Sequence, residues 1–480
     1  MSVAVKRKTA KKGLDYSQIF ESHKKKSLEL RKQALGDRIA KLKKLRKWVY
    51  GNRKVISDAI YDDFRKPEPE SELTETYVVL TELNHAIKHL GEWTKSKSVH
   101  TPITYVGSSA KIAYEPKGTS LIIAPWNFPF NLAVGPLVSA IAAGNTAIIK
   151  PSEMTPSTSS MVKDMVEELF NEDEVCVIEG GVEETTELLK LPFDHIFFTG
   201  SPGVGKIVMK AASENLSSIT LELGGKSPFI IDPKANLEDA AEKLVWGKFM
   251  NNGQTCIAPD YVLVHSSVKQ ELIDNIRVKI NAYFNADGNG IEKSEDYGRI
   301  VNTKHFDRLA SMIENAIEFG FELEFGGEVN KKELYISPTV FSDVDLKSEL
   351  MQEEIFGPIL PILTYDHIDE VISLVNSKSK PLAIYVFSTN STFIKAIDAE
   401  TSSGTMVIND CVIHFLHPNL PFGGVNTSGI GKSHGYHGFL AFSNEKAMLK
   451  QRIGLTSLKP LYPPYTTAIK KLVSILVKNF

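Results

Sequence analysis

The sequence predicts an α/β protein with two successive domains. Short, uninterrupted apolar runs recur between about residues 119 and 408, separated by stretches long enough to form a helix. Such runs are typical of strands that are buried on both faces of a parallel sheet. The chain of 480 residues, 42% of them hydrophobic, supplies enough apolar material for more than one core.

The first 95 residues carry a helical pattern. From about residue 15 onward, apolar residues recur at three- and four-residue spacing, with few Gly or Pro. Lys and Arg outnumber Asp and Glu by 18 to 4 over residues 1–54. We interpret this basic segment as a frayed tail followed by the solvated face of a helix, with attraction to a membrane surface as the alternative.

The expected strands follow the helical segment in order. Those of the first domain cover residues 119–124, 146–150, 175–178, 195–198 and 220–225. A further run at residues 228–231 opens a second series that continues to about residue 408. Because Gly224 and Gly225 interrupt the strand pattern, we place the boundary between the two domains there.

The last stretch of the chain is an amphipathic tail. Pro463 and Pro464 end regular structure. Apolar residues then fall on one helical face, namely Ile469, Leu472, Val473, Leu476 and Phe480. The tail is too short to span a bilayer. We expect it to dock on the body of the protein or on a partner subunit, with contact to a membrane surface or to a lipid-like substrate mouth as the alternative.

The composition excludes several classes of protein. A formal net charge of −3 gives no field that would favour nucleic acid. Cys176, Cys256 and Cys411 are widely spaced, so neither a disulfide framework nor a zinc site is indicated. The sequence has no signal-peptide pattern and no apolar stretch long enough to cross a membrane. We expect a cytoplasmic protein, peripheral to a membrane if the tail binds one, with no metal.

Cys256 and Glu222 are the first candidates for chemistry. Cys256 follows a polar, glycine-containing stretch that can present a thiol to a cleft. A lone cysteine is, by itself, more often a small buried hydrophobe. Glu222 lies between two leucines at the end of an expected strand, where burial would raise its pKa toward that of a general base. The structural alternative is a glutamate paired with Lys226 or with backbone amides.

Six short blocks, in order along the chain, resemble the aldehyde dehydrogenase superfamily. Two of them are the Glu-Leu-Gly-Gly-Lys-Ser run from Glu222 and the Asn-Gly-Gln-Thr-Cys context of Cys256. The others cover residues 125–129, 198–205, 354–358 and 421–429. Residues 246–250, 258–261 and 462–464 resemble the class 3 branch, which includes fatty and aromatic aldehyde dehydrogenases. The similarity spans roughly residues 30 to 450.

The resemblance implies a particular division of the chain. Two doubly wound, Rossmann-like domains are expected, one that binds NAD(P) and one that is catalytic. The NAD(P)-binding domain would cover residues 1–225, with a bridging β segment near 97–115, and the catalytic domain would cover 226–408. Residues 409–480 would form a bridging and oligomerisation segment followed by the tail. A homodimer is expected.

The resemblance also implies a cofactor site. Gly200, Ser201 and Gly205 match the family's cofactor turn, which departs from the usual G-x-G-x-x-G spacing but still lets the backbone approach a pyrophosphate at a helix N-terminus. Lys150 and Glu153 match the segment that holds the adenine ribose. Because Glu153 would repel a 2′-phosphate, we expect NAD to be favoured over NADP. The remaining expected contacts are Trp126, Glu354 and Phe356.

The resemblance implies a mechanism as well. Cys256 would attack the aldehyde, Asn127 and the Cys256 backbone N–H would form the oxyanion hole, and Glu222 would activate the water that hydrolyses the thioester. Glu354 is the alternative base. The expected substrate is a medium- or long-chain aliphatic or an aromatic aldehyde, oxidised to the carboxylic acid.

Two other functions stay open. One is a coenzyme A-acylating semialdehyde dehydrogenase, a class that often lacks the glutamate found here at Glu222. The other is a catalytically silent structural protein on the same fold, which would have no reason to keep Cys256, Glu222 and Asn127.

Overall fold

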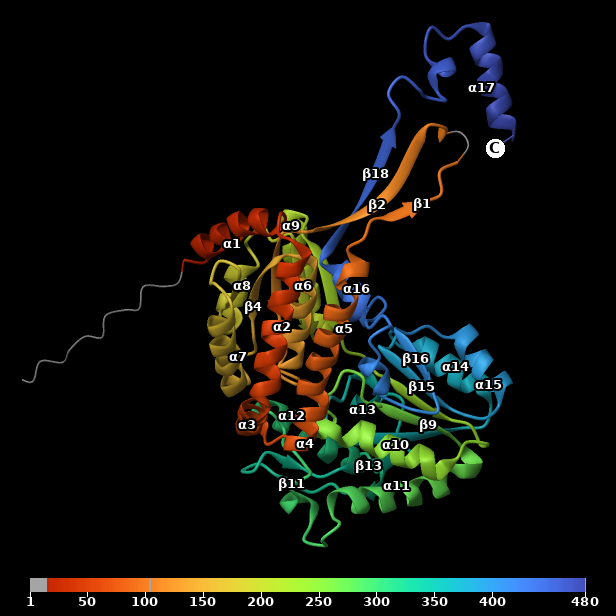
Figure 1. Cartoon of the computed structure of the whole chain (residues 1–480). Helices are drawn as coiled ribbons and strands as arrows, with labels where there is room; N and C mark the ends of the chain where they lie inside the picture. Colours follow the sequence, from red (N-terminus) through yellow and green to blue (C-terminus); the bar gives the residue numbers. More distant parts are fainter. Residues whose placement is uncertain (1–14, 103–104, 480) are drawn as a thin grey trace, which may run out of the picture.

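The chain forms two α/β bodies and a projecting arm (Figure 1). The computed structural model describes residues 15–102 and 105–479. The basic residues before position 15 and Phe480 of the tail lie outside the described residues. Mixed helices and largely parallel sheets confirm the predicted α/β class.

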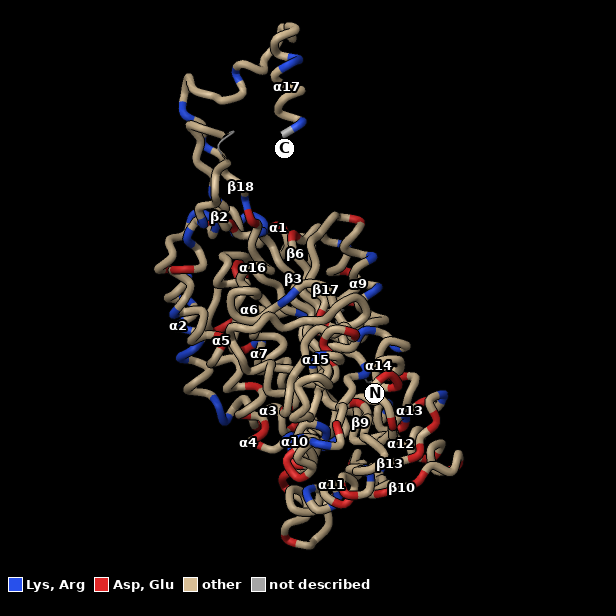
Figure 2. The backbone as a smooth tube through the Cα atoms, turned by 90° about the vertical axis from the view of Figure 1, so that its right-hand side faces the viewer, with Lys and Arg blue, Asp and Glu red and all other residues tan. Residues whose placement is uncertain are grey.

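The N-terminal part of the chain is helical, as predicted. Its helices are α1 (Tyr16–Leu30), α2 (Leu35–Gly51), α3 (Arg53–Phe64), α4 (Glu68–Ser71) and α5 (Tyr77–Trp93). Figure 2 marks the Lys and Arg positions along the backbone of α1 and α2. The side chains of these residues are exposed or half-buried. The predicted solvated helix face is therefore observed, and α2 and α5 share one hydrophobic core.

A six-stranded sheet follows, with the order β17-β7-β6-β3-β4-β5. Its strands are β3 (Thr119–Ile123), β4 (Thr146–Lys150), β5 (Val175–Val177), β6 (His195–Gly200), β7 (Ser218–Leu223) and β17 (Gly429–Ile430). Five of them run parallel, and β17 pairs antiparallel with β7. The predicted strands match to within two residues at each end, whereas the two-residue β17 was not predicted.

Helices cover both faces of this sheet. They are α6 (Asn131–Ala143), α7 (Pro156–Leu169), α8 (Val182–Leu188) and α9 (Pro202–Asn215), together with the N-terminal helices and α16 (Gly435–Ala441). Ile122 of β3 packs into the core with α2, α5, α6 and α7, whereas its neighbours Leu121 and Ile123 pack into the core with α1, α8 and α9. Burial on both faces explains why these strands are continuous apolar runs.

A seven-stranded sheet forms the second body, with the order β10-β13-β14-β9-β8-β15-β16. Its strands are β8 (Pro228–Ile231), β9 (Tyr261–His265), β10 (Glu322–Phe325), β13 (Thr339–Ser342), β14 (Ile359–Tyr365), β15 (Ala383–Phe387) and β16 (Thr405–Ile408). Its helices are α10 (Leu237–Phe249), α11 (Lys269–Phe284), α12 (Thr303–Glu318), α13 (Glu349–Gln352), α14 (Ile368–Ser377) and α15 (Ser391–Glu400). A short hairpin of β11 (Val329–Asn330) and β12 (Tyr335–Ile336) lies beside it. The chain passes from the first sheet to the second across Gly224 and Gly225.

The arm is a three-stranded antiparallel sheet. Its strands are β1 (Lys97–Val99), β2 (Ser108–Pro116) and β18 (Ser443–Gln451), in the order β1-β2-β18. β18 pairs with β2 along nine residues. Because β18 is the last strand in the order, its other edge has no strand beside it among the described residues. The arm extends well beyond the two bodies (Figure 1).

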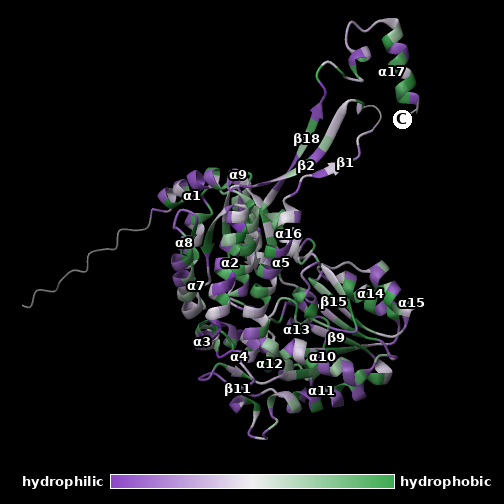
Figure 3. Cartoon of the chain, in the orientation of Figure 1, coloured by the Kyte–Doolittle hydropathy of each residue, from purple (hydrophilic) through white to green (hydrophobic). Residues whose placement is uncertain are grey.

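The C-terminal helix α17 (Thr467–Asn479) lies beyond the tip of the arm. Hydrophobic and hydrophilic residues alternate around it, as Figure 3 shows, and Leu472, Val473 and Val477 are exposed. The expectation that the tail docks on the body of its own chain is therefore wrong, because no part of the body lies close enough to cover it. Within the part of the chain that the structure describes, no helix has the length and apolar character needed to cross a membrane.

Candidate active site

The predicted site residues meet at the carboxyl ends of the six-stranded sheet. Trp126 and Asn127 follow β3, Gly200 and Ser201 lie at the end of β6, and Glu222 lies at the end of β7. Because parallel strands end at the same edge of a sheet, these residues gather around one cavity. The cavity has a volume of about 250 Å³.

Eight of the eleven predicted site residues line this catalytic cavity. They are Trp126, Asn127, Gly200, Ser201, Glu222, Cys256, Glu354 and Phe356. Lys150, Glu153 and Gly205 are not among the lining residues. The cavity is therefore shared by residues from both bodies of the molecule.

A tight loop presents Cys256 to the cavity. Asn251, Asn252 and Gly253 all have left-handed backbone angles, with φ of 53°, 53° and 70°. Asparagine and glycine are the residues that adopt this conformation most readily. A Cβ on Gly253 would lie 2.3 Å from the carbonyl oxygen of Gly357, so the loop approaches the segment after Phe356 as closely as its backbone allows.

The side chain of Gln254, two residues before Cys256, holds the loop in place. Its side-chain amide donates to the carbonyl oxygens of Asn251, at 3.0 Å, and Arg299, at 3.1 Å. Its Oε1 accepts from the backbone N–H of Val301 at 3.0 Å. Because Gln254 is fully buried, these bonds anchor the loop to the second body.

The thiol of Cys256 is in its protonated form at neutral pH. Burial, together with the carboxylates of Glu354 and Glu222, raises the pKa of Cys256 well above its ordinary value. The backbone N–H groups of Cys256 itself and of Ile257 act in the opposite direction. A nearby base is therefore needed to form the thiolate.

Asn127 lies against the Cys256 loop. Its side-chain Nδ2 donates to the carbonyl oxygen of Gln254 at 3.0 Å, and its own carbonyl oxygen accepts from Asn251 at 2.8 Å. An amide nitrogen carries two donors, so one N–H of Asn127 is left for a second acceptor. The side chain is almost completely buried, which fixes the direction of that donor.

Glu222 is buried and is held by two hydroxyl groups. The Ser433 hydroxyl donates to Oε1, and the Thr199 hydroxyl donates to Oε2 at 3.3 Å. Burial raises the pKa of Glu222, whereas the neighbouring His434, Ser433 and Thr199 lower it. These contacts come from β6 and from the turn before α16, which are far apart in the sequence.

The alternative in which Glu222 pairs with Lys226 is wrong. Lys226 forms its ion pair with Asp260 and also donates to the carbonyl oxygens of Leu350, at 2.7 Å, and Glu353, at 2.8 Å. Glu222 is therefore not neutralised by the lysine that follows it in the sequence.

Glu354 is the second carboxylate of the cavity. Burial and the nearby Asp260 raise the pKa of Glu354 to about 8, against the opposing effects of the Gly225 backbone N–H, Lys226 and Arg308. Glu354 is therefore largely protonated at neutral pH.

A helix N-terminus adjoins the cavity. Ser201 caps α9, where its hydroxyl accepts from the backbone N–H of Val204 at 3.4 Å. A Cβ on Gly205 would lie 2.8 Å from the Leu223 side chain, so this glycine allows close packing of helix on strand. Helix N-termini of this kind bind phosphate groups through free backbone N–H donors and the helix dipole.

Lys150 and Glu153 lie at the end of the adjacent strand β4. The buried Lys150 ammonium donates to Glu153 at 3.1 Å and to the Gly180 carbonyl oxygen at 2.8 Å. The Glu153 side chain is 44% exposed and remains open to a ligand hydroxyl. The residues expected to hold a dinucleotide therefore fit one, because they occupy neighbouring strand ends of a doubly wound sheet.

Sequence reasoning missed several residues of this region. His305 and Arg308 of α12 line the cavity, and Trp126 packs between His305 and Phe356, with ring centroids 5.0 and 5.4 Å apart. Ser433 was also missed as a partner of Glu222. None of these residues belongs to a motif, so the sequence carried no signal for them.

Comparisons with known proteins cover most of the chain. A family model described as the aldehyde dehydrogenase family matches residues 3–448. The 4,4'-diaponeurosporen-aldehyde dehydrogenase of Staphylococcus aureus is 45% identical over 456 residues, or 95% of this chain and 96% of that protein. Aldehyde dehydrogenase family 3 member A2 of Pongo abelii is 44% identical over 437 residues, or 90% and 88% of the two chains.

A solved structure is similarly close. The substrate-bound state of Staphylococcus aureus AldH superposes with a TM-score of 0.92 at 44% identity, covering 97% of this chain and 100% of that chain.

Proposed function

Since the chain belongs to the aldehyde dehydrogenase family, in its class 3 branch, and is an NAD(P)-dependent oxidoreductase, we propose that it oxidises its aldehyde through a covalent bond to Cys256. The observation that carries the proposal is the shared cavity of Cys256, Glu222 and Asn127. These residues come from three separate stretches of the chain.

Attack begins when the Cys256 thiol loses its proton. Glu222 and Glu354 both line the cavity, and either carboxylate, when ionised, accepts that proton as sulfur bonds to the aldehyde carbon. Negative charge then develops on the aldehyde oxygen. The free N–H of Asn127 and the backbone N–H of Cys256 stabilise it, and such donors are typically worth ~3 kcal/mol each.

The strand ends described above would hold the cofactor. Gly200, Ser201 and Gly205 would form the turn for the pyrophosphate, and Lys150 and Glu153 would hold the adenine ribose. Trp126, Glu354 and Phe356 would contact the nicotinamide half. When bound, the nicotinamide supplies the acceptor for the hydride that leaves the aldehyde carbon. NAD is favoured because the Glu153 carboxylate would repel a 2′-phosphate.

Hydrolysis of the Cys256 thioester needs a base for water. We rank Glu222 first, because hydroxyl donors from Ser433 and Thr199 stabilise its ionised form. Glu354 ranks second, because a pKa of about 8 leaves it largely protonated at neutral pH. Attack by the activated water releases the carboxylic acid and the Cys256 thiolate. The thiolate takes its proton back from the newly formed acid, which leaves as the carboxylate, while the proton taken from water stays on Glu222.

The substrate class, the oligomeric state and the role of the tail are also part of the proposal. The Staphylococcus aureus relative is named for 4,4'-diaponeurosporen-aldehyde. For this chain the proposed substrate is a medium- or long-chain aliphatic or an aromatic aldehyde, as the resemblance to the class 3 branch implies. The open edge of β18 and the exposed side chains of Met448 and Leu449 support a homodimer that covers the arm. The exposed apolar face of α17, with its lysines, supports contact with a membrane surface or a substrate mouth.

Replacement of the thiol tests the proposal directly. We expect Cys256→Ala to abolish aldehyde oxidation while NAD binding, measured by calorimetry, stays within about twofold, because the thiol is needed only for chemistry. Wild-type protein should release free acid, with or without coenzyme A. Turnover by Cys256→Ala, or a coenzyme A thioester as the main product, would contradict the proposal.

A further inference from the structure

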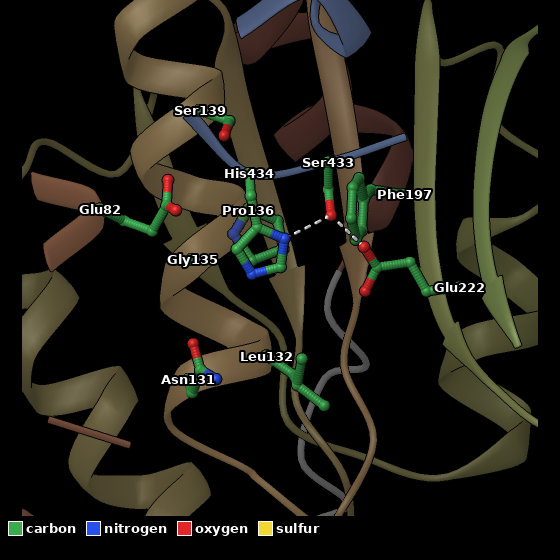
Figure 4. A pocket seen from close by; sticks show the side chains of 10 residues that line it. All are labelled: Glu82, Asn131, Leu132, Gly135, Pro136, Ser139, Phe197, Glu222, Ser433 and His434. Carbon is green, nitrogen blue, oxygen red and sulfur yellow. Dashed lines mark hydrogen bonds between the residues drawn. The ribbon is translucent and has the colours of Figure 1, made fainter. Parts of the chain in front are cut away.

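A second, smaller cavity shares Glu222 with the catalytic cavity. It has a volume of about 20 Å³, which is room for about one water molecule. Its polar lining residues are Glu82, Asn131, Ser139, Glu222, Ser433 and His434 (Figure 4). Cys256 does not line it, so the cavity is not needed to hold the reacting thiol.

Hydrogen bonds lead from Glu222 into this inner cavity. The Ser433 hydroxyl donates to Glu222, and its oxygen also lies 3.0 Å from Nδ1 of His434 (Figure 4). A hydroxyl can accept one proton while it donates its own, and an imidazole can do the same through its two nitrogens. Glu222, Ser433 and His434 therefore form a continuous path for a proton.

Glu82 closes the far wall of the inner cavity. This residue of α5 is 6% exposed, and its Oε2 accepts from the backbone N–H of Gly435 at 2.8 Å. Burial raises the pKa of Glu82 to about 7, so the group exchanges protons near neutral pH. It has no ion-pair partner among the described residues.

His85 lies between the inner cavity and the surface. It follows Glu82 by one helical turn along α5 and packs on Gly435, where a Cβ would come within 3.1 Å of its ring. His85 also lines an open surface cavity of about 620 Å³. Because Glu82 and His85 both contact Gly435, His85 is the residue through which we expect a proton on Glu82 to reach solvent.

The backbone of His434 is held in an unfavourable conformation. Its φ of 68° and ψ of 138° are rarely adopted by residues other than glycine. Bonds on either side hold it there, because Ser433 and Phe422 exchange backbone hydrogen bonds and Gly435 is bound by Glu82. Strain of this kind persists where the position of a side chain matters for function.

We propose that Ser433, His434 and Glu82 form a proton exit path that returns Glu222 to its ionised form after each hydrolysis. This inference rests on the proposed role of Glu222 as the base. The charged and titratable groups that face the path include Glu222, Lys432, His434, His414 and His85, from β7, the turn before α16, residues 413–416 and α5.

Each transfer is balanced. Once Glu222 carries the proton taken from water, it donates to the Ser433 oxygen, and the Ser433 hydroxyl turns to donate to Nδ1 of His434, whose neutral ring then holds its own proton on Nε2. The Glu222 proton passes to the Ser433 oxygen, and the original Ser433 proton passes to Nδ1 of His434. The Nε2 proton of His434 crosses the inner cavity through a water molecule to the Glu82 carboxylate. Glu82 then loses a proton to solvent by way of His85. One proton enters the path and one leaves it, and no electrons move.

Glu82→Gln tests the path. Glutamine keeps the acceptor for the Gly435 N–H but cannot carry a proton. We expect the burst of reduced cofactor and the KM for aldehyde to stay within about twofold, and acid release measured by rapid quench to fall about tenfold, below the ~10²–10⁴-fold that positioned proton transfer contributes. Added imidazole, a small proton carrier, should restore part of the loss.

Controls separate this path from a structural role and from the proposed function. Glu187→Gln, at an exposed glutamate of α8 that lines neither the inner nor the surface cavity, should leave all of these rates unchanged. Ser433→Ala should reproduce the slow release and its rescue, and serves if Glu82→Gln does not fold. Wild-type release rates in both variants, or a raised KM with unchanged release, would overturn the path. Hydrolysis by Glu222→Gln would instead overturn the proposed base.

Discussion

At the scale of single residues, the site contains two buried carboxyl groups, Glu222 and Glu354, whose surroundings differ. Burial raises the pKa of both Glu222 and Glu354, but two hydroxyl donors oppose the rise at Glu222, whereas the like charge of Asp260 adds to it at Glu354. Environments that push two carboxyl groups apart in pKa commonly assign them different roles. The pair therefore supports Glu222 as base and Glu354 as a neutral hydrogen-bond donor at neutral pH.

The raised pKa of Glu354 predicts a pH-dependent stability. Glu354 is protonated in the folded protein up to about pH 8, but in the unfolded chain it ionises near its ordinary value of 4.5. Between these values the folded state binds the extra proton, so its contribution to stability is full at low pH and is lost as the pH rises, by at most about 1.4 kcal/mol per pH unit. Glu354→Gln removes this contribution.

Urea unfolding of both proteins at about pH 5, 7 and 9 checks the sign. The wild-type protein should lose stability relative to Glu354→Gln as the pH rises. Parallel stability curves would show that Glu354 ionises at its ordinary pKa.

At the scale of elements, the strand ends and one tight loop create the site. Five parallel strands end at one edge and bring together the residues that we propose to hold the cofactor. The left-handed turn at residues 251–253 reverses the chain after α10 and directs Cys256 toward that edge. The turn depends on the left-handed backbone conformation of Gly253. A side chain at this position would therefore displace the Cys256 thiol.

Substitutions at two glycines measure how strongly the turn at residues 251–253 controls the position of the Cys256 thiol. Gly253 and Gly288 have nearly equal φ, 70° and 72°, but only Gly253 is in close contact, since no atom lies within 4 Å of a Cβ placed on Gly288. Gly288→Ala should cost about 1 kcal/mol of stability and leave kcat unchanged. Gly253→Ala should cost more and should lower kcat by up to ~10²-fold, because it displaces the Cys256 loop. Equal kcat values for the two variants would show that the loop adjusts freely.

At the scale of the whole molecule, the catalytic cavity lies between two bodies and the arm is left exposed. Each body has its own helices on both faces of its sheet, so each can form a core alone. The arm has no such cover, and β18 presents an open edge along with exposed apolar side chains. An uncovered edge of this length is normally protected by another chain or surface.

Removal of residues 466–480 tests what the tail contributes. We expect turnover of long-chain aldehydes to change more than turnover of short ones, because the proposed role of α17 at a substrate mouth concerns only aldehydes long enough to extend out of a cavity. Kinetics across an aliphatic series, run with both NAD and NADP, measures this. Light scattering on the same samples reports whether the shortened chain still dimerises. Equal effects at all chain lengths would contradict a role at the substrate mouth.

The sequence by itself determined the α/β class, the strands of the first sheet to within two residues, and the family. These follow from local patterns, since a strand buried on both faces must be apolar throughout and the motif blocks are contiguous. Tertiary structure alone decided which groups surround Glu222: Lys226, its neighbour in sequence, pairs with Asp260, and Ser433, more than 200 residues away, donates to it instead. It also decided that α17 lies off the body. Such partners depend on how distant strands and turns pack, which no local pattern records.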